Sequence, residues 1–408
     1  MIYNLIRIIL YPFVRFLLPL FSSKARDQLK LELSNVNHYE PDVIFHVSSE
    51  GELEQCLSLV LHLLKKHRVL IVFTSKSVHT KLESLCKQHE KLSMEALRIV
   101  SYFPFFDKSI NKYKVVKAFF MVRYDFFPEL IKFSQNNRSF LLNATLKNKL
   151  DSNFFESFYL KYALSSFNKI IVASEKEYQN FKSFGVHLPL FAFDLRVLRI
   201  LERKNKCMDT LREKIEDSDN FFALLNSKVF KSKVILGSYW NSEFPILSLA
   251  IKKSLKEHKL ILCAPHDLKD IENIKKSFNK SSIDYLVCTD KSSFKDALES
   301  LKSQNAILIF TAKGVLCELY SFFDHAYIAG GWHRSIHSVL EPFLMGNAFI
   351  SCGPNTHRST EFDLVAQLDS SRIKSYNRIH DFEIGHNTII KKLDYEEQFR
   401  ELMEFLNI

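Results

Sequence analysis

A cluster of acidic residues follows the first apolar run of the chain, in the segment S-S-E-G-E-L-E-Q. Ser49 and Glu52 have the S-x-x-E spacing of a capping box, in which the serine accepts the Glu52 N–H and the glutamate side chain reaches back. Projecting from a strand end, Glu52 could instead be a general base that takes a proton from an attacking hydroxyl. Repulsion from Glu50 and Glu54 could raise its pKa towards a useful value. The spacing alone leaves both interpretations open.

Two pairs of opposite charge follow later strands of the same half. Arg123 and Asp125 come after an apolar run and before Pro128, a residue typical of a first helical turn. They are either a surface ion pair at a helix start or part of a catalytic site. Asp194 and Arg196 follow the last expected strand of this half, where the Arg196 guanidinium could neutralise a leaving phosphate.

A second group of candidate residues lies in the stretch A-G-G-W-H-R-S-I-H-S-V-L-E-P-F-L-M-G, which begins at Ala329. Gly330 and Gly331 come straight after an expected strand and would let a ligand approach the backbone. The helix expected next would present free N–H groups to an anion, and the Glu341 carboxylate could accept two ribose hydroxyls. This pattern indicates a nucleotide pocket; the alternative is a tight turn followed by a first-turn acid that the helix dipole favours.

Three further loops with polar residues each follow an expected strand of the second half. We expect them to line the same pocket, because ligands bind at the carboxyl ends of the strands in parallel sheets. The residues are Gly237 and Ser238 in L-G-S-Y-W, Pro265 and His266 in A-P-H-D, and Lys313, Gly314 and Val315 in T-A-K-G-V-L.

We predict no metal site and no cofactor. His333, His337 and Glu341 are spaced four residues apart, but they lack the H-E-x-x-H arrangement of zinc enzymes. The chain also contains no G-x-S-x-G or Walker pattern, which argues against an α/β-hydrolase and a P-loop kinase.

Short apolar runs that alternate with amphipathic segments predict the elements that position these residues. Such alternation is typical of α/β proteins with parallel sheets covered by helices on both faces. In the first half the expected strands are 43–47, 69–74, 118–122, 139–142 and 169–173, with helices at 51–66, after Pro128 and at 174–184. In the second half the expected strands are 234–236, 260–264, 285–288, 307–310, 325–328 and 348–351, with helices at 243–257, 267–278 and 395–406.

The alternation stops and restarts once, which predicts two Rossmann-like domains that face each other across a cleft. The intervening residues are polar and of mixed charge, and we expect one helix among them. The predicted divisions are an N-terminal membrane segment at 1–30, a first domain at 31–200, a linker at 201–232, a second domain at 233–375 and a helical segment at 376–408.

Residues 2–22 are strongly apolar but contain Arg7, Arg15 and two prolines. They are either a poor single span or an amphipathic helix that lies in the membrane interface; the alternative is a first helix packed on the domain. Lys24, Arg26 and Lys30 follow, as expected on the cytoplasmic side of a membrane. No small-residue cleavage site follows, which argues against a signal peptide.

The overall composition limits the partners. Lys and Arg exceed Asp and Glu by 56 to 46, so the net charge of +10 suits a nucleotide, a phosphorylated lipid or a membrane surface. No nucleic-acid-binding motif is present, so we expect no nucleic-acid partner. Four of the seven cysteines lie in apolar runs and indicate a reducing compartment; these are Cys56, Cys263, Cys288 and Cys352.

Taken in order, these motifs resemble the 3-deoxy-D-manno-octulosonic acid (Kdo) transferases of lipopolysaccharide synthesis. The resemblance covers nearly the whole chain and rests on F-H-V-S-S-E-G-E-L-E-Q, which is similar to the family's H-x-x-S-x-G-E, and on R-Y-D-F-F-P-E, G-S-Y-W, A-P-H-D, I-H-S-V-L-E-P-F-L-M-G and G-P-N. It implies a GT-B fold and an inverting transfer of Kdo from CMP-Kdo to a lipid A precursor at the cytoplasmic face of the inner membrane, with no cofactor.

The resemblance also implies roles for individual residues. Glu52 matches the family's catalytic base, and Arg196 matches a basic residue that stabilises the transition state. The positions that match the family's CMP contacts are Pro265, His266, Lys313, Gly314, Val315, Ser338, Val339, Leu340 and Glu341.

The chain departs from the family pattern at several positions. Arg123 and Asp125 stand where the family has two glutamates, and Phe127 stands where it has tryptophan. Other departures are Phe193, Ser335, Ile336 and Ser338. They leave two alternatives open, namely an inactive membrane-associated binding protein of the same fold and a transferase that uses another nucleotide sugar.

Overall fold

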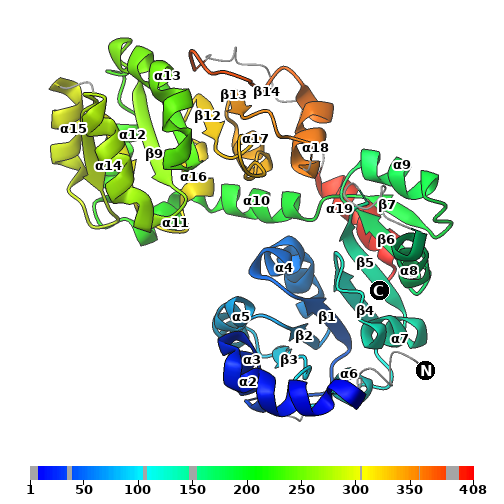
Figure 1. The fold of residues 1–408 in the computed structure, drawn as a ribbon. Helices are drawn as coiled ribbons and strands as arrows, with labels where there is room; N and C mark the ends of the chain where they lie inside the picture. Colours follow the sequence, from blue (N-terminus) through cyan, green and yellow to red (C-terminus); the bar gives the residue numbers. More distant parts are fainter. Residues whose placement is uncertain are drawn as a thin grey trace. The chain divides into compact units, whose positions relative to one another are not determined.

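The computed structural model describes residues 8–34, 39–103, 108–146, 154–303, 306–357, 359–382 and 395–408 (Figure 1). The chain divides into two compact units, one made of Met1–Arg199 with Asp394–Ile408 and the other of Ile200–Leu393. Each unit contains a seven-stranded sheet in which every described strand pair is parallel. The predicted pair of parallel α/β sheets is therefore confirmed, and the two units are described separately below.

The sheet of the first unit has the strand order β3-β2-β1-β4-β5-β6-β7. Its central strand β1 pairs with β2 on one side and β4 on the other, so the chain direction across the sheet reverses there. This is the position at which open α/β sheets bind ligands. The strands are β1 (Val43–Val47), β2 (Val69–Phe73), β3 (Leu92–Ala96), β4 (Ala118–Val122), β5 (Ser139–Ala144), β6 (Lys169–Val172) and β7 (Leu190–Ala192).

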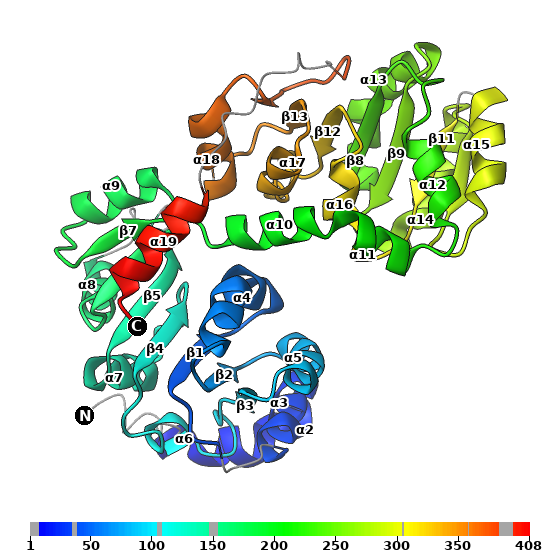
Figure 2. The ribbon, with the colours of Figure 1, turned by 180° about the vertical axis from the view of Figure 1, so that it is seen from behind.

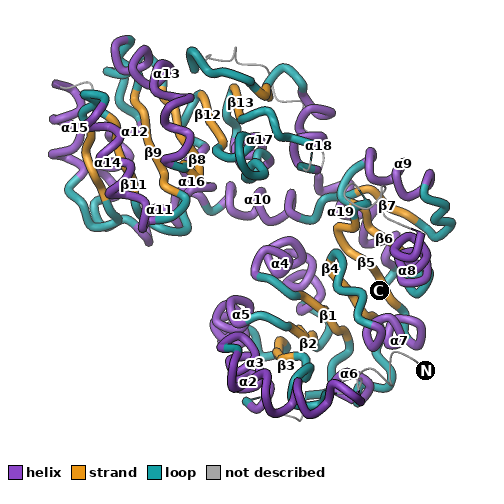
Figure 3. The backbone as a smooth tube through the Cα atoms, in the orientation of Figure 1, coloured by secondary structure: helices purple, strands orange, loops and turns teal. Residues whose placement is uncertain are grey.

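Helices cover both faces of this sheet (Figures 1 and 3). Successive side chains of a strand point to opposite faces, so Val43, Phe45 and Val47 join one apolar cluster and Ile44 joins the other. The helices of the unit are η1 (Phe13–Leu17), α2 (Leu18–Phe21), α3 (Ser23–Leu33), α4 (Glu50–Leu64), α5 (Lys76–Gln88), α6 (Lys108–Asn111), α7 (Pro128–Asn136), α8 (Phe154–Leu164), α9 (Glu175–Ser183) and α19 (Tyr395–Leu406).

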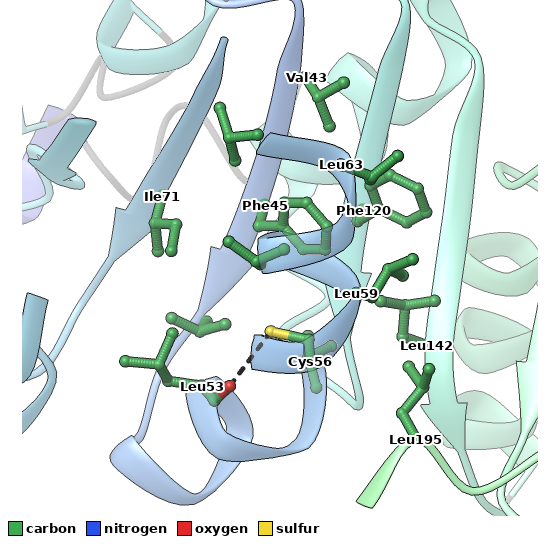
Figure 4. Packing of buried hydrophobic residues seen from close by; sticks show 14 of the residues in the cluster. Val43, Phe45, Leu53, Cys56, Leu59, Leu63, Ile71, Phe120, Leu142 and Leu195 are labelled. Atoms are coloured by element: carbon green, nitrogen blue, oxygen red, sulfur yellow. Dashed lines mark hydrogen bonds between the residues drawn. The ribbon is translucent and has the colours of Figure 1, made fainter. Parts of the chain in front are cut away.

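Figure 4 shows the cluster on the α4 side, where Phe45 and Phe120 stack with ring centroids 4.5 Å apart. The buried Cys56 of α4 donates a hydrogen bond to the Leu53 carbonyl oxygen, 3.5 Å away. The last helix of the chain, α19, joins the same cluster through Leu402 and Leu406, and Figure 2 shows it lying along this unit. The core beneath α4 thus fixes the start of that helix against the end of β1.

The second sheet has the order β10-β11-β9-β8-β12-β13-β14, with the reversal between β8 and β12. Its strands are β8 (Lys233–Tyr239), β9 (Leu260–Pro265), β10 (Tyr285–Cys288), β11 (Ile307–Phe310), β12 (His325–Ile328), β13 (Phe349–Cys352) and β14 (Ile373–Ser375). Its helices are η2 (Asn241–Glu243), α13 (Phe244–Lys256), η3 (Leu268–Asp270), α14 (Ile271–Lys280), α15 (Phe294–Ser303), α16 (Leu316–Tyr320), α17 (Leu340–Met345) and α18 (Thr360–Asp369).

The expectation of a single helix between the two sheets is wrong. Three helices follow one another there: α10 (Arg196–Asn205), α11 (Cys207–Lys214) and α12 (Ser218–Leu225). They carry buried apolar residues, among them Leu211, Phe221 and Leu224, so they pack into the protein. Mixed charge on their exposed faces gives this segment its polar composition.

The N-terminal apolar segment is helical from residue 8, and many of its side chains are exposed. Within the described part of the chain, no helix has both the length and the apolar character needed to cross a membrane. All seven cysteines are free, and the four expected in the core are buried.

Candidate functional site

Four polar side chains gather where β1 and β4 end in the first unit: His46, Ser48, Glu52 and Asp125. His46 is the fourth residue of β1, Ser48 follows the strand, and Glu52 lies in the first turn of α4. Asp125 follows β4, the neighbour of β1 in the sheet. The sheet thus brings together Glu52 and Asp125, which are far apart in sequence.

Glu52 is held by two adjacent serines that contact different parts of it. The Ser49 hydroxyl accepts a hydrogen bond from the Glu52 backbone N–H at 3.3 Å, as the capping-box interpretation predicts. The carboxylate reaches back one residue further than in a standard box. Its Oε2 atom accepts the Ser48 N–H at 2.7 Å and the Ser48 hydroxyl at 2.8 Å. Glu52 is therefore both a capping residue and an anchored carboxylate.

Asp125 interacts with both Ser48 and His46. Burial raises the pKa of Asp125, and a hydrogen bond from the Ser48 side chain partly offsets that rise. His46 is fully buried, with its Nε2 atom 4.0 Å from an oxygen of Asp125. Burial lowers the pKa of His46 to about 4, although the charge of Glu52 acts in the opposite direction. His46 is therefore neutral at neutral pH.

Arg123 has a left-handed backbone with φ of 65°, which is uncommon for a residue other than glycine. Its N–H donates to the Leu142 carbonyl oxygen of β5 at 3.0 Å, and this bond holds the turn. The buried Nε atom of its guanidinium has no hydrogen-bond partner among the described residues. Strained backbone of this kind is concentrated at functional sites, although it does not identify the role.

Arg196, at the start of α10, is paired with Asp194. Its Nε and Nη2 atoms donate to the Asp194 carboxylate at 2.9 and 2.5 Å, and its backbone N–H donates to Oδ1 at 3.0 Å. Asp194 is almost fully buried. The pair fixes the orientation of the guanidinium and offsets part of its charge.

In the second unit, Gly237 is a packing position. A Cβ atom at Gly237 would lie 2.1 Å from the hydroxyl oxygen of the buried Tyr320, so no larger residue fits there. Its carbonyl oxygen accepts the Ala329 N–H at 3.1 Å. Ser238 beside it has φ of 51° and lies at an irregularity in the β8–β9 pairing. The two residues lie within β8, and the strand continues to Tyr239 rather than ending before them.

Aromatic and imidazole rings from three loops stack at the carboxyl edge of the second sheet. The ring of His266, after β9, lies 4.2 Å from that of Trp240 and 4.4 Å from that of His337. The indole N–H of Trp240 donates to Nε2 of His337 at 3.0 Å. The Arg334 guanidinium lies over the Trp240 ring, 4.2 Å from the ring centroid. The predicted convergence of the Pro265–His266 loop and the His337 loop is thus observed.

Burial lowers the pKa of His337 to about 4, and the neighbouring His266 and Arg334 act in the same direction. Burial also lowers the pKa of His266. Both rings are neutral at neutral pH, and a neutral stack suits packing against a flat heterocycle better than binding of a phosphate.

The expectation that the helix start after Gly331 offers free N–H groups to an anion is wrong. Residues 331–339 form a loop, and α17 begins only at Leu340. The Leu340 N–H donates to Glu361 of α18 at 3.2 Å, and the Glu341 N–H donates to the Ser338 hydroxyl at 3.3 Å. The Ser338 hydroxyl in turn donates to Glu361 at 2.7 Å. A carboxylate of the protein therefore already occupies this position.

Glu341 itself is half-buried beside a buried ion pair. One of its oxygens lies 3.9 Å from Nη1 of Arg203, which also makes two hydrogen bonds of 2.8 Å to Glu318. Val339 before it is buried. Ser338 and Glu341 thus lie on one short turn, and their polar groups already contact other groups of the protein, namely Glu361 and Arg203.

The loop between β11 and α16 contains the remaining predicted residues. Lys313 and Gly314 are exposed, and Val315 is buried and precedes α16. Gly314 has φ of 74°, and its carbonyl oxygen accepts a hydrogen bond from Lys214 at 3.1 Å. Lys313 is therefore available to solvent on a loop whose neighbours are fixed.

Sequence reasoning gave no role to Glu243, a buried carboxylate under the glycine turn. It accepts hydrogen bonds from the Tyr327 hydroxyl at 2.6 Å and from the Gly330 N–H at 2.7 Å. Burial raises the pKa of Glu243 to about 7, although both hydrogen bonds lower it. Ser48, Trp240, Arg334 and Glu361 were also missed; Ser48 and Trp240 lie inside the recognised motifs, whereas Arg334 and Glu361 carry no local signal.

Among the described residues, no three His, Cys, Asp or Glu side chains are arranged to hold a metal ion. The two described sites instead offer an anchored carboxylate in one unit and a stack of neutral rings with a guanidinium in the other. The first can accept a proton, and the second can pack against a base.

Comparison with known proteins agrees with this chemistry. Residues 21–191 match the family model described as 3-deoxy-D-manno-octulosonic-acid transferase (kdotransferase). The 3-deoxy-D-manno-octulosonic acid transferase of Aquifex aeolicus (strain VF5) is 26% identical over 364 residues, which is 88% of this chain and 89% of that protein. The match therefore extends over both units.

Solved structures support the fold. UDP-GlcNAc 2-epimerase from Neisseria meningitidis bound to UDP-GlcNAc superposes with a TM-score of 0.55 at 15% identity, covering 90% of this chain and 92% of that one. The C-terminal CMP-Kdo binding domain of WaaA from Acinetobacter baumannii has a TM-score of 0.30 at 11% identity, covering 43% of this chain and 84% of that one, and such a score does not bear on function. The fold is GT-B-like in having two parallel α/β sheets.

Proposed function

We propose that the chain is a Kdo transferase, because residues 21–191 match the model of that family and the Aquifex aeolicus enzyme is 26% identical to it. In this proposal it moves Kdo from CMP-Kdo to a hydroxyl of a lipid A precursor, with inversion, and Glu52 is the general base. The family assignment supports the reaction type. The choice of CMP-Kdo as donor, of a lipid A precursor as acceptor and of Glu52 as base is our proposal.

The observation that carries the role of Glu52 is the asymmetric anchoring of its carboxylate. Both hydrogen bonds to the carboxylate, from the Ser48 N–H and hydroxyl, fall on Oε2. Oε1 accepts no hydrogen bond from any described residue, and the side chain is partly exposed at the carboxyl edge of the sheet. One oxygen fixes the orientation while the other can accept the proton of an acceptor hydroxyl.

In the proposed transfer step, the acceptor oxygen forms a bond to C2 of Kdo, the bond between C2 and the CMP phosphate oxygen breaks, and the hydroxyl proton passes to Glu52. CMP leaves with the bonding electron pair. Because its phosphate is a good leaving group, the reaction requires a base and charge stabilisation more than a strong nucleophile.

In the second unit we propose that the Pro265–His266 loop, the 313–315 loop and residues 338–341 contact CMP. The ring stack around His266 supports binding of the cytosine base, because a heterocycle can pack against neutral aromatic rings. Exposed Lys313 supports binding of the phosphate. The Glu361 carboxylate at the α17 start disfavours a phosphate at that position.

The activity is tested by incubating the purified protein with CMP-Kdo and a tetraacylated disaccharide lipid and measuring the product mass. We expect addition of Kdo by the wild type and a loss of about 10²–10⁴-fold in rate for Glu52→Gln, the usual contribution of a general base. Glu50→Gln is the matched control, because this exposed acid lies on the same helix turn and contacts Lys81 at 3.5 Å instead.

Two results would contradict the proposal. An active Glu52→Gln enzyme would remove Glu52 as the base. Stabilisation of the protein by UDP or GDP but not by CMP in a thermal-shift assay would indicate another nucleotide sugar, since a specific ligand raises the unfolding temperature.

We also propose that the N-terminal segment holds the enzyme at the cytoplasmic face of the inner membrane. Apolar side chains along residues 8–21 are exposed, for example Ile9 at 68%, Phe16 at 60% and Phe21 at 84%. Exposed apolar surface of this kind marks interaction sites with lipid or protein. Co-flotation of the full chain with anionic phospholipid vesicles, and its loss in Phe16→Ser with Phe21→Ser, would test this.

A further inference from the structure

Ser48 is the residue that determines how the Glu52 carboxylate is oriented. Among the described residues, the two hydrogen bonds to this carboxylate both come from Ser48, at 2.7 Å from its N–H and 2.8 Å from its hydroxyl. The backbone bond would exist with any residue at position 48 other than proline. The hydroxyl bond depends on the serine side chain.

The Ser48 hydroxyl is not needed to begin the helix. The cap of α4 is Ser49, whose hydroxyl accepts the Glu52 N–H at 3.3 Å. The Ser48 hydroxyl donates to a side-chain oxygen instead, and the Glu52 carboxylate already satisfies the Ser48 N–H. The two adjacent serines therefore have separate roles, since Ser49 holds the backbone of Glu52 and Ser48 holds its carboxylate.

The position of Ser48 between two acids adds a second effect. Its side chain also hydrogen-bonds towards Asp125, whose pKa is raised by burial and lowered by this contact. A hydroxyl carries one proton and can donate to one carboxylate at a time. In the observed arrangement the hydroxyl donates to Glu52 at 2.8 Å, so Glu52 is the carboxylate that it fixes.

We propose that Ser48 is a positioning residue of the transfer reaction, which fixes Oε2 of Glu52 through its hydroxyl so that Oε1 faces the acceptor hydroxyl. This inference rests on the proposed function of Glu52. Ser48 does not take the proton itself. A base must hold the right geometry in the transition state, and small displacements of a positioned group lower the rate strongly.

The expected effect is on turnover rather than on substrate binding. In Ser48→Ala the 2.7 Å backbone bond remains, so Glu52 stays near its place but can rotate about its side-chain torsions. We expect kcat to fall about tenfold while KM for CMP-Kdo and for the lipid changes less than about twofold, as for an interaction that matters mainly in the transition state. Ser48→Thr retains a hydroxyl and should restore most of kcat.

The decisive measurement is a double-mutant cycle with Glu52→Gln. If Ser48 acts through Glu52, then Ser48→Ala should not lower the residual rate of Glu52→Gln any further. Ser49→Ala serves as a control for loss of a hydroxyl at the same helix start, and it should lower the unfolding temperature more than Ser48→Ala does. Circular dichroism spectra identify any variant that fails to fold.

The outcomes separate the two proposals. If Ser48→Ala keeps the wild-type kcat while Glu52→Gln is inactive, the positioning role is refuted and the base assignment stands. If Glu52→Gln is active, the base assignment fails, and the role of Ser48 fails with it. An equal further loss from Ser48→Ala in both backgrounds would show an effect independent of Glu52 and would also refute the inference.

Discussion

The buried histidine beside the proposed base should make the first unit sensitive to acid. His46 lies in the central strand β1 with no exposed surface, and neither of its ring nitrogens has a hydrogen-bond partner among the described residues. Burial lowers its pKa from 6.5 to about 4, against the opposing effect of the Glu52 carboxylate. Asp125, 4.0 Å away, does not form a hydrogen bond with it. Protonation of His46 therefore places a charge inside the sheet that the nearby carboxylates offset only in part.

The sign and size of the effect follow from linkage. Below pH 6.5 the unfolded chain binds a proton at this histidine more readily than the folded protein does, so the free energy of unfolding decreases as the pH falls. The decrease begins near pH 6.5 and is complete near pH 4. At about 1.36 kcal/mol per unit of pKa difference, His46 should lower the stability by about 2 kcal/mol between pH 7.5 and pH 5.

Urea denaturation of the wild type and of His46→Gln at pH 7.5 and pH 5 measures this loss of unfolding free energy. Both tryptophans, Trp240 and Trp332, belong to the second unit, so tryptophan fluorescence reports that unit and far-UV circular dichroism reports both. His46→Gln should reduce the pH dependence of the first unit by about 2 kcal/mol and leave the fluorescence transition unchanged. An identical pH dependence in wild type and variant would refute the assignment of a neutral, buried His46.

Two further predictions concern packing and buried hydrogen bonds. Gly237→Ala should destabilise the second unit by about 1–3 kcal/mol, because the new Cβ would lie 2.1 Å from the Tyr320 hydroxyl oxygen; tryptophan fluorescence measures this loss. Gly51→Ala in the first unit, whose Cβ would approach nothing closer than 4.0 Å, is the control and is followed by far-UV circular dichroism. Glu32→Gln should destabilise the attachment of α3 by about 1.5–3 kcal/mol, because the buried carboxylate accepts three backbone N–H groups of residues 99–101 at 2.6 to 3.0 Å. Faster hydrogen exchange of residues 97–103 would show this, and unchanged exchange would contradict it.

The strands that could be predicted from the sequence are continuous apolar runs, and most of them are buried on both faces; β10 is a predicted strand that is only partly buried. In β1, β2, β4, β11 and β12 every residue is buried, so they are continuous apolar runs. The strands that were missed lie at the edges of the sheets: β3 is L-S-M-E-A and β14 is I-K-S. The three-residue strand β7 was expected only as the strand end before Asp194, without bounds. Partly exposed strands of this kind have no continuous apolar run, and their pairing depends on neighbours supplied by the rest of the sheet.

The sequence could predict which site residues lie near one another where their positions depend only on the ends of the strands. Parallel strands bring their carboxyl ends to one edge, and so Glu52 and Asp125, or His266 and His337, could be expected to meet. Which rings stack, and that Glu361 of α18 closes the α17 start, depend on contacts between segments distant in sequence. No local pattern around Glu361 indicates this contact. The interpretation of Glu341 as a first-turn acid was correct, whereas the anion-binding interpretation of this helix start was wrong.

The S-x-x-E pattern occurs at both candidate sites, and the two cases show what this spacing does and does not determine. Ser49 and Glu52, and likewise Ser338 and Glu341, form the same serine-to-N–H hydrogen bond at 3.3 Å. The two glutamate side chains nevertheless differ, because Glu52 turns back to Ser48 whereas Glu341 lies 3.9 Å from Arg203.

The reason lies in the neighbours of each helix start. At the first site Ser48 supplies both an N–H and a hydroxyl to the glutamate of its own turn. At the second site Glu361 comes from another helix and takes the Ser338 hydroxyl and the Leu340 N–H, and an oxygen of Glu341 lies 3.9 Å from Arg203. The spacing therefore determines the backbone of a helix start, while the neighbouring groups decide whether its carboxylate is anchored within its own turn or lies beside a cation.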